Sequence, residues 1–150
     1  MSDKPLFDPE KLSIIEFKLI NGQVDTPEEF ITEKVERYEL ENSLQLAFNL
    51  EEKLVKVDYR IDILSDSKGG NAKEASARFH FVYIYKVENL KELAVSDDAS
   101  LIDLDQHLAN ALSSITYSTS RGVLLTRLQG TAFQNFILPV INPNKLLPNK

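Results

Sequence analysis

The residues that could perform acid–base chemistry or bind a metal are few and lie far apart in the sequence. The two histidines, His80 and His107, fall in different predicted elements, and neither has a second histidine at helical spacing. A metal site needs several such ligands together, so the sequence predicts none. Paired carboxylates could form an acid/base pair only if the fold drew two of them into one cleft. They occur where turns and helix starts favour acidic residues anyway, at Glu51-Glu52, Asp97-Asp98 and Asp103/Asp105.

Motifs for nucleophilic and phosphate chemistry are also missing from the sequence. The serines between Ser113 and Ser120 lack the Gly-x-Ser-x-Gly pattern of a nucleophile elbow. Gly69-Gly70 lacks the Lys-Ser/Thr pair or the third glycine that phosphate-binding loops need. The chain has no cysteine, which excludes disulfides, thiol catalysis and cysteine-based zinc sites. We therefore predict a protein that is not an enzyme, with no catalytic residue, no metal and no other cofactor.

Composition and charge indicate one soluble globular domain over residues 1–150, with 43% hydrophobic and 27% charged residues. A net charge of −6 argues against nucleic acid or an anionic membrane as the partner. The polar N-terminus contains Pro5 and Pro9, and we expect a flexible arm at residues 1–10 without a signal peptide. No apolar run approaches the roughly 20 residues that cross a bilayer. We expect a cytoplasmic protein with no membrane insertion.

Two alternating runs in the middle of the chain must provide the scaffold. From Tyr38 to Leu50 every second residue is apolar, except Asn42, and the run from Val55 to Ile63 repeats the pattern. A period of two predicts half-buried strands. The short polar link at Glu51-Glu52 predicts that they form an antiparallel hairpin. Another part of the chain must pack against the apolar face of this hairpin.

The segment before the hairpin predicts another strand and a crossover. Residues 12–20 are mostly apolar, which suits a strand with both faces at least partly covered. Asn21-Gly22 predicts either a tight turn or a bulge that lets the strand continue to Asp25. Residues 27–37 are charged, with a few apolar side chains at weakly helical spacing. Either a crossover loop or a short helix fits them.

A fourth strand is predicted after the clearest loop in the chain, residues 65–71. Residues 74–87 alternate again, and the apolar face of this strand is rich in aromatic residues. We interpret that face as one that packs against helices, with an exposed client-binding surface as the alternative.

A long helix is predicted to follow. Ser100 with Asp103 resembles a capping box, and apolar residues recur every three or four positions from Leu101 to Leu128. Gly130 suits the end of the helix.

This helix would be long for a chain of this size, so we expect either a break between Asn110 and Ser114 or an extension into an oligomer interface. The tail after it cannot continue the helix because of three prolines, Pro139, Pro143 and Pro148. The elements together predict an α+β fold in which a long helix packs on a four-stranded antiparallel sheet.

The segment after the helix, from Gly130 to Asn142, resembles the end of the SecB protein-export chaperone family. Members close their long helix with Gly-Thr, which is followed by an apolar segment with Gln and Asn and then by Pro-Val ahead of an Asn. Val24-Asp25-Thr26-Pro27 is similar to the family's motif at the end of strand one. The order of strand, crossover, three strands, helix and tail also fits. The resemblance spans residues 12–147, and its sharp motif is the C-terminal one.

The resemblance implies a cytoplasmic, ATP-independent holdase, assembled as a tetramer from two dimers, that binds unfolded preprotein clients in long apolar grooves. Each residue that matches the groove is also compatible with an ordinary core position. On this assignment Phe133→Ala with Phe136→Ala would weaken client binding and leave the oligomer intact. The matching residues lie in the crossover, on the helix and after it: Phe30, Ile31, Val35, Leu124, Leu128, Phe133, Phe136 and Ile137.

The sequence departs from the family at the acidic sheet residues that dock the translocase motor ATPase. Asn21 and His80 occupy two of those places, and Asp25 alone stays acidic. Ile84-Tyr85-Lys86 replaces the glycines usual at the end of strand four. Client holding is therefore implied, and docking of the motor at Asp25 is left open. An interaction module with one dedicated partner, such as an antitoxin, is the alternative to a general holdase.

The long helix has more apolar residues than one sheet face can cover. Ile102, Val123 and Leu125 lie off the main apolar stripe. We therefore predict self-association of the chain through this helix and a sheet edge, to a tetramer.

Overall fold

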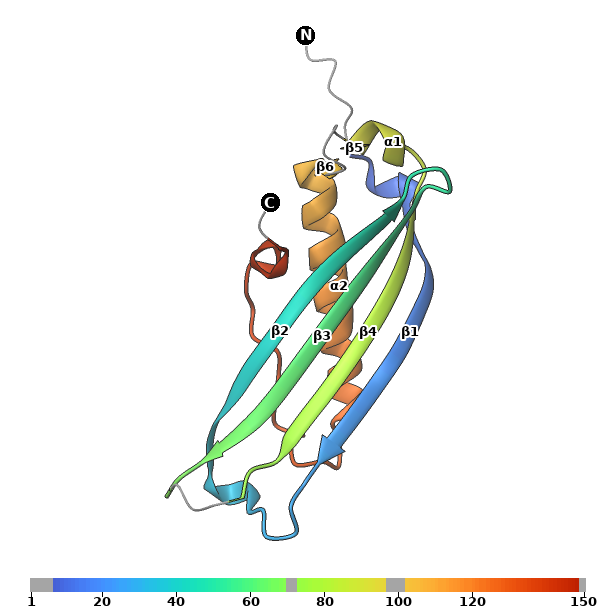
Figure 1. The fold of residues 1–150 in the computed structure, drawn as a ribbon. Helices are drawn as coiled ribbons and strands as arrows, with labels where there is room; N and C mark the ends of the chain where they lie inside the picture. The colour runs from blue at the N-terminus through green and yellow to red at the C-terminus, as the bar shows by residue number, and fades with distance from the viewer. Residues whose placement is uncertain (1–6, 70–72, 97–101, 149–150) are drawn as a thin grey trace.

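The computed structural model describes residues 7–69, 73–96 and 102–148, in which a four-stranded sheet lies against one long helix (Figure 1). Of the predicted arm at 1–10, residues 1–6 lie outside the described residues, and Pro9–Lys11 forms a short 3-10 helix, η1. The other elements follow in chain order: β1 (Leu12–Asp25), η2 (Thr32–Lys34), β2 (Val35–Asn49), β3 (Leu54–Ser67), β4 (Ser76–Val87), α1 (Leu90–Leu93), β5 (Ala94–Ser96), β6 (Ile102–Leu104), α2 (Gln106–Arg127) and η3 (Pro143–Leu146).

The sheet is antiparallel with the strand order β1-β4-β3-β2, which confirms the predicted fold class. The predicted hairpin is β2 and β3, joined by a turn in which Lys53 has a φ of 62°. β1 continues through Asn21-Gly22 to Asp25, as the bulge alternative predicted. Its register against β4 shifts twice, between Ile14 and Glu16 and between Leu19 and Asn21. Both β1 and β2 are edge strands of this sheet.

One face of β3 and β4 forms the core, and α2 packs on it. Two tyrosine hydroxyls of β4 form hydrogen bonds with hydroxyls of α2. Tyr83 bonds to Ser120 at 2.6 Å, and Tyr85 bonds to Thr116 at 2.7 Å. Burial raises the pKa of Tyr85 to about 12, so this phenol stays protonated and serves as a neutral hydrogen-bond partner. The aromatic face of β4 is buried. The prediction that it packs against a helix is confirmed, and the alternative of an exposed client surface is wrong.

The long helix begins later than the sequence predicted. Ile102–Leu104 is not helical but forms β6, which pairs with β5. The helix starts at Gln106 after Asp105, whose carboxylate accepts hydrogen bonds from the first backbone N–H groups of α2. Ser100, the predicted cap, lies outside the described residues. Leu104 matches the helical spacing of α2 by coincidence, because it belongs to the two-stranded ribbon of β5 and β6.

α2 is continuous over 22 residues, so the predicted break between Asn110 and Ser114 is wrong. Ser113 lies inside this helix, and its hydroxyl donates to the carbonyl of Ala109, four residues back, at 3.0 Å. Within the described part of the chain, no helix is long and apolar enough to cross a membrane.

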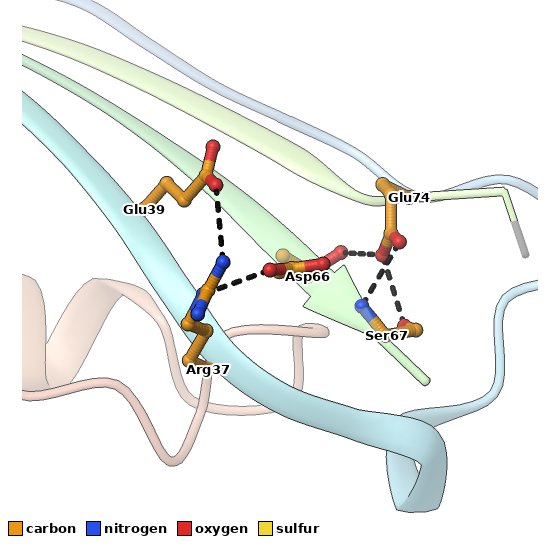
Figure 2. Close-up of polar contacts among 6 residues, drawn as sticks. Arg37, Glu39, Asp66, Ser67 and Glu74 are labelled. Atoms are coloured by element: carbon orange, nitrogen blue, oxygen red, sulfur yellow. Dashed lines mark hydrogen bonds and ion pairs between the residues drawn. The ribbon is translucent and has the colours of Figure 1, made fainter. Parts of the chain in front are cut away.

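The carboxylate of Glu74 links the two ends of the loop between β3 and β4 through hydrogen bonds (Figure 2). β3 continues to Ser67, so the loop begins later than predicted. Glu74 accepts from the Ser65 hydroxyl at 2.7 Å and from the Ser67 hydroxyl and backbone N–H, each at 2.9 Å. The Ser67 backbone and Ser65 hydroxyl bonds lower the pKa of the Glu74 carboxyl. On the neighbouring strand, Arg37 pairs with Asp66 at 2.8 Å.

We expect this carboxylate to make stability depend on pH. Because its pKa is lower in the folded state, its contribution is complete above the unfolded pKa and is lost as pH falls through the folded pKa. Glu74→Gln should therefore lower the melting temperature at pH 7, and the difference from the parent should shrink in acid. Thermal unfolding followed by circular dichroism at several pH values measures both effects. Glu28→Gln, at an exposed loop position, is the control and should change neither.

Candidate client-binding groove

The tail after α2 turns back along the helix on the side of β2 (Figure 1). Gly130 has a φ of 77°, the left-handed conformation that ends helices and that glycine adopts without strain. Thr131 then fixes the turn, because its hydroxyl donates to the Leu128 carbonyl at 2.7 Å and accepts from the Phe133 N–H at 3.1 Å. The Gly-Thr pair thus ends the helix and sets the direction of the tail.

Hydrogen bonds from one face of α2 hold the tail in an irregular, mostly non-helical path. The Tyr117 hydroxyl donates to the carbonyl of Pro139 at 2.6 Å. Farther along, Ser113 donates to the side-chain oxygen of Asn144 at 2.8 Å, and the Asn144 amide donates to Asn110 at 2.9 Å. The prolines remove backbone donors, so these side-chain contacts replace regular secondary structure.

A groove with a volume of about 380 Å³ lies between β2 and the tail. Tyr38 of β2 is half-buried, and its ring centroid lies 5.6 Å from that of Phe133 and 5.5 Å from that of Phe136. Burial raises the pKa of the Tyr38 phenol, so the groove has no charge at this position. The residues that line the groove are Tyr38, Leu40, Asn135, Phe136, Ile137 and Pro139.

The residues predicted after the helix divide between the groove and the core beside it. Phe136 and Ile137 line the groove, and Ile137 is 61% exposed, so its side chain is available to a partner. Phe133 is fully buried and meets the groove only through its contact with Tyr38. Phe136 is 7% exposed, so its ring forms part of the wall.

The predicted residues on the helix and in the crossover lie outside the lining of this groove. Leu124 and Leu128 are buried in the core between helix and sheet. Phe30, in the loop before β2, and Val35, the first residue of β2, are half-buried. Ile31, which follows Phe30, is 45% exposed. Ile31 is thus the crossover residue with a largely accessible apolar side chain.

Sequence reasoning missed the β2 wall of the groove. Tyr38 and Leu40 were assigned only to the apolar face of a hairpin strand. The tail also supplies Asn135 and Pro139, which carry no apolar periodicity. The available signal was the edge position of β2, because the last strand of a sheet leaves its outer side chains only partly covered.

A second hollow, of about 410 Å³, lies on the sheet face opposite α2, and residues of all four strands line it. Asp25, at the end of β1, accepts a hydrogen bond from Gln23 at 2.8 Å. Arg78 is the cation of the lining and is bound to Asp62 at 2.9 Å. The hollow is therefore acidic, with the carboxylates of Asp25, Glu39, Glu41 and Asp62 in its lining.

The two histidines lie in separate places. His80, on β4 opposite Asn21 of β1, pairs with Asp58 at 2.7 Å, and both side chains are largely buried. Lys56 lies 3.7 Å from the same carboxylate. His107 is exposed in the first turn of α2. In the described ranges, no three His, Cys, Asp or Glu residues come together as possible metal ligands.

Comparisons with known proteins identify the fold. No family model matches the chain, and no curated protein matches its sequence. Among solved structures, the chain is similar to the Mycobacterium tuberculosis SecB-like chaperone Rv1957, in complex with a ChAD peptide from the Rv1956 HigA1 antitoxin. The TM-score is 0.63 at 14% identity, over 88% of this chain and 91% of that one. A protein of unknown function from Streptococcus agalactiae aligns over 86% and 97% of the two chains at 12% identity with a TM-score of 0.33, which is too low to support an argument. The chain therefore has the fold of a SecB-like chaperone.

Proposed function

We propose that this protein is an ATP-independent SecB-like chaperone that binds unfolded polypeptide segments in the groove between β2 and the tail. The observation that carries the proposal is an open apolar groove beside a sheet edge, on a fold shared with a SecB-like chaperone. The exposed side chain of Ile137 gives a client an apolar contact that folding of the chain itself does not use.

An extended client segment fits the shape of this groove. Among the described residues no strand pairs with the outer edge of β2, so its free N–H and C=O groups lie beside the groove. A client strand could bond to them and place alternate side chains against Tyr38 and Leu40. Apolar burial, worth about 25 cal/mol per Å², would supply most of the binding free energy. Main-chain bonds do not depend on side-chain identity, so this mode suits many clients.

The rival function is an interaction module for one dedicated partner, such as an antitoxin. The observation that favours it is the antitoxin peptide in the complex of the M. tuberculosis protein. Both functions can use the same groove. They differ in the number of unrelated sequences that bind.

An aggregation-suppression assay with several unrelated unfolded proteins separates the two functions. For a general holdase we expect suppression of all of them, without nucleotide, at roughly stoichiometric chaperone. Suppression of a single client would indicate the dedicated module. Lack of suppression for every client, together with no binding of unfolded peptides, would contradict the chaperone proposal.

The proposal has three finer parts. The protomers assemble as a tetramer from two dimers, supported by the exposed apolar side chain of Leu125 on the outer face of α2. In an export pathway, the translocase motor ATPase would dock at the acidic hollow that contains Asp25. The protein would hold preproteins in the cytoplasm, with no enzymatic step, nucleic acid or membrane insertion. The net charge of −6 supports the expectation that the protein binds no nucleic acid and does not insert into a membrane.

A further inference from the structure

The two walls of the groove between β2 and the tail differ in what they offer to a client main chain. β2 is an edge strand, and among the described residues no strand pairs with its outer edge. The tail wall, from Asn135 to Pro139, is irregular, and Pro139 has no N–H group to donate. The β2 wall alone can therefore form a ladder of main-chain hydrogen bonds with an extended segment.

An extended client segment has main-chain polar groups on both of its sides. The N–H and C=O groups of successive residues in a strand point to opposite edges. The groups that point away from β2 face the tail wall, where Phe136, Ile137 and Pro139 are apolar. Burial of an amide group without a hydrogen-bond partner is unfavourable. A client therefore loses part of the affinity gained from apolar burial unless the tail wall supplies a polar partner.

Asn135 is the side chain of the tail wall that can supply this partner. It lies at the end of the turn after α2, lines the groove and is exposed. Within the described part of the chain no hydrogen bond or ion pair engages its amide group. The other polar side chain of the lining is Tyr38, whose hydroxyl donates to the Ala132 carbonyl at 3.5 Å. Two later asparagines of the tail serve the protein's own structure, since Asn142 accepts from the Asn144 N–H and Asn144 bonds to α2.

The backbone on either side of Asn135 is fixed by contacts of its neighbours. The Phe136 N–H donates to the Phe133 carbonyl at 2.8 Å, which closes the turn. The rings of Phe133 and Phe136 lie 5.6 and 5.5 Å from the ring of Tyr38. Asn135 is thus held at the groove by packing that its own side chain does not share, and its amide group is available to a client.

We propose that Asn135 binds the main chain of the client, so that a client strand paired with β2 is also bound on its other side. This inference rests on the proposed function and specifies how the tail wall takes part in it. The side-chain carbonyl accepts from a client N–H, and the side-chain NH₂ group donates to a client C=O. Neither bond depends on the side chains of the client. The ligand of Asn135 is therefore an unsubstituted peptide group.

The substitution Asn135→Leu separates a main-chain contact from a purely apolar groove. Leucine is similar in size and has no polar group, so in a purely apolar groove the substitution would strengthen client binding. With the main-chain contact we expect Asn135→Leu to weaken binding about fivefold, because client polar groups lose their partner. Gln134→Leu is the control and should bind like the parent, since Gln134 is adjacent and exposed but does not line the groove.

Fluorescence anisotropy measures both effects with a labelled, serine-rich peptide that contains one Leu-Thr-Phe segment. This single pair of apolar residues gives the peptide one preferred register in the groove. Asn135 is exposed and its side chain makes no hydrogen bond in the described chain, so Asn135→Leu should melt like the parent. A change in Kd then reports the contact with the peptide.

Ester substitutions in the peptide test the same contact from the client side. Each replaces one amide by an ester and so removes one N–H donor. An ester at the residue that faces Asn135 should weaken binding to the parent about fivefold and should cost nothing further in Asn135→Leu. Esters at residues that face β2 should weaken binding to both proteins equally. Esters whose effects are the same in the two proteins at every position would overturn the inference.

The variant Ile137→Asp distinguishes a failure of this inference from a failure of the proposed function. If it weakens binding while Asn135→Leu strengthens binding or leaves it unchanged, clients occupy the groove without a bond to Asn135. The inference alone is then overturned. If neither variant changes the Kd of the peptide, the groove is not the binding site, and the proposed function fails together with the inference.

Discussion

Alanine at both Phe133 and Phe136 is expected to unfold much of the protein at room temperature rather than merely to release its clients. Phe133 is fully buried and Phe136 is 7% exposed, and both rings contact Tyr38. A buried Phe→Ala change costs about 3–5 kcal/mol, while the whole free energy of unfolding of a domain is about 5–15 kcal/mol. The double substitution therefore removes a large part of the stability. Urea denaturation followed by circular dichroism measures the loss.

This expectation replaces the one that followed from the sequence resemblance, in which the double variant stays folded and loses clients. Gln134 lies between Phe133 and Phe136 in the sequence, and its side chain is exposed. Gln134→Ala is therefore the matched control and should unfold at the parental urea concentration. If the double variant keeps parental stability and oligomeric state but no longer binds unfolded peptides, the two rings act in the groove. In that case the burial argument fails and the sequence-based expectation is correct.

The strands could be predicted from the sequence because their alternation is local. β3 and β4 each bury one face almost completely, and a period of two records such burial directly. β1 was less certain because its two register shifts interrupt the alternation near Ile15 and Ile20. Only pairing with β4 shows that the strand continues to Asp25.

The start of the helix could not be predicted because a tertiary contact decides it. Leu104 continues the apolar spacing of α2 toward the N-terminus, yet it pairs with Ala94 in the β5–β6 ribbon. The short helix α1 before this ribbon was also missed, since four residues show no periodicity. Asp105 was noted as one of several acidic residues, and only its bonds to α2 identify it as the cap.

The candidate groove could be located only in part. Phe136 and Ile137 were identified because the family resemblance marks the segment after Gly130. Whether a side chain in that segment faces the groove or the core depends on the path of the tail, which Tyr117 and Ser113 of α2 fix through hydrogen bonds. Those contacts join residues 22 and 31 positions apart, so no local pattern records them.

Ile137→Asp is expected to weaken binding of unfolded clients while the protein remains folded. The side chain lines the groove and is 61% exposed, so the substitution removes little of the protein's own core. A client that covers this isoleucine gains roughly 1.5–3 kcal/mol from full burial of the side chain, equivalent to about a ten- to hundredfold change in Kd. A carboxylate there would add a desolvation cost. Fluorescence anisotropy with a labelled, permanently unfolded peptide measures the change.

Val140→Asp is the matched control, because Val140 lies three residues farther along the same tail, is 91% exposed and does not line the groove. Both variants add the same charge to the same segment, so a general electrostatic effect on clients would change their affinities equally. Screening offers a further separation, since exposed charges interact over only about 10 Å at 0.1 M salt. If the groove binds clients, the defect of Ile137→Asp should persist in high salt, because lost apolar burial is not screened. Equal defects in the two variants, or none in either, would place client binding outside the groove between β2 and the tail.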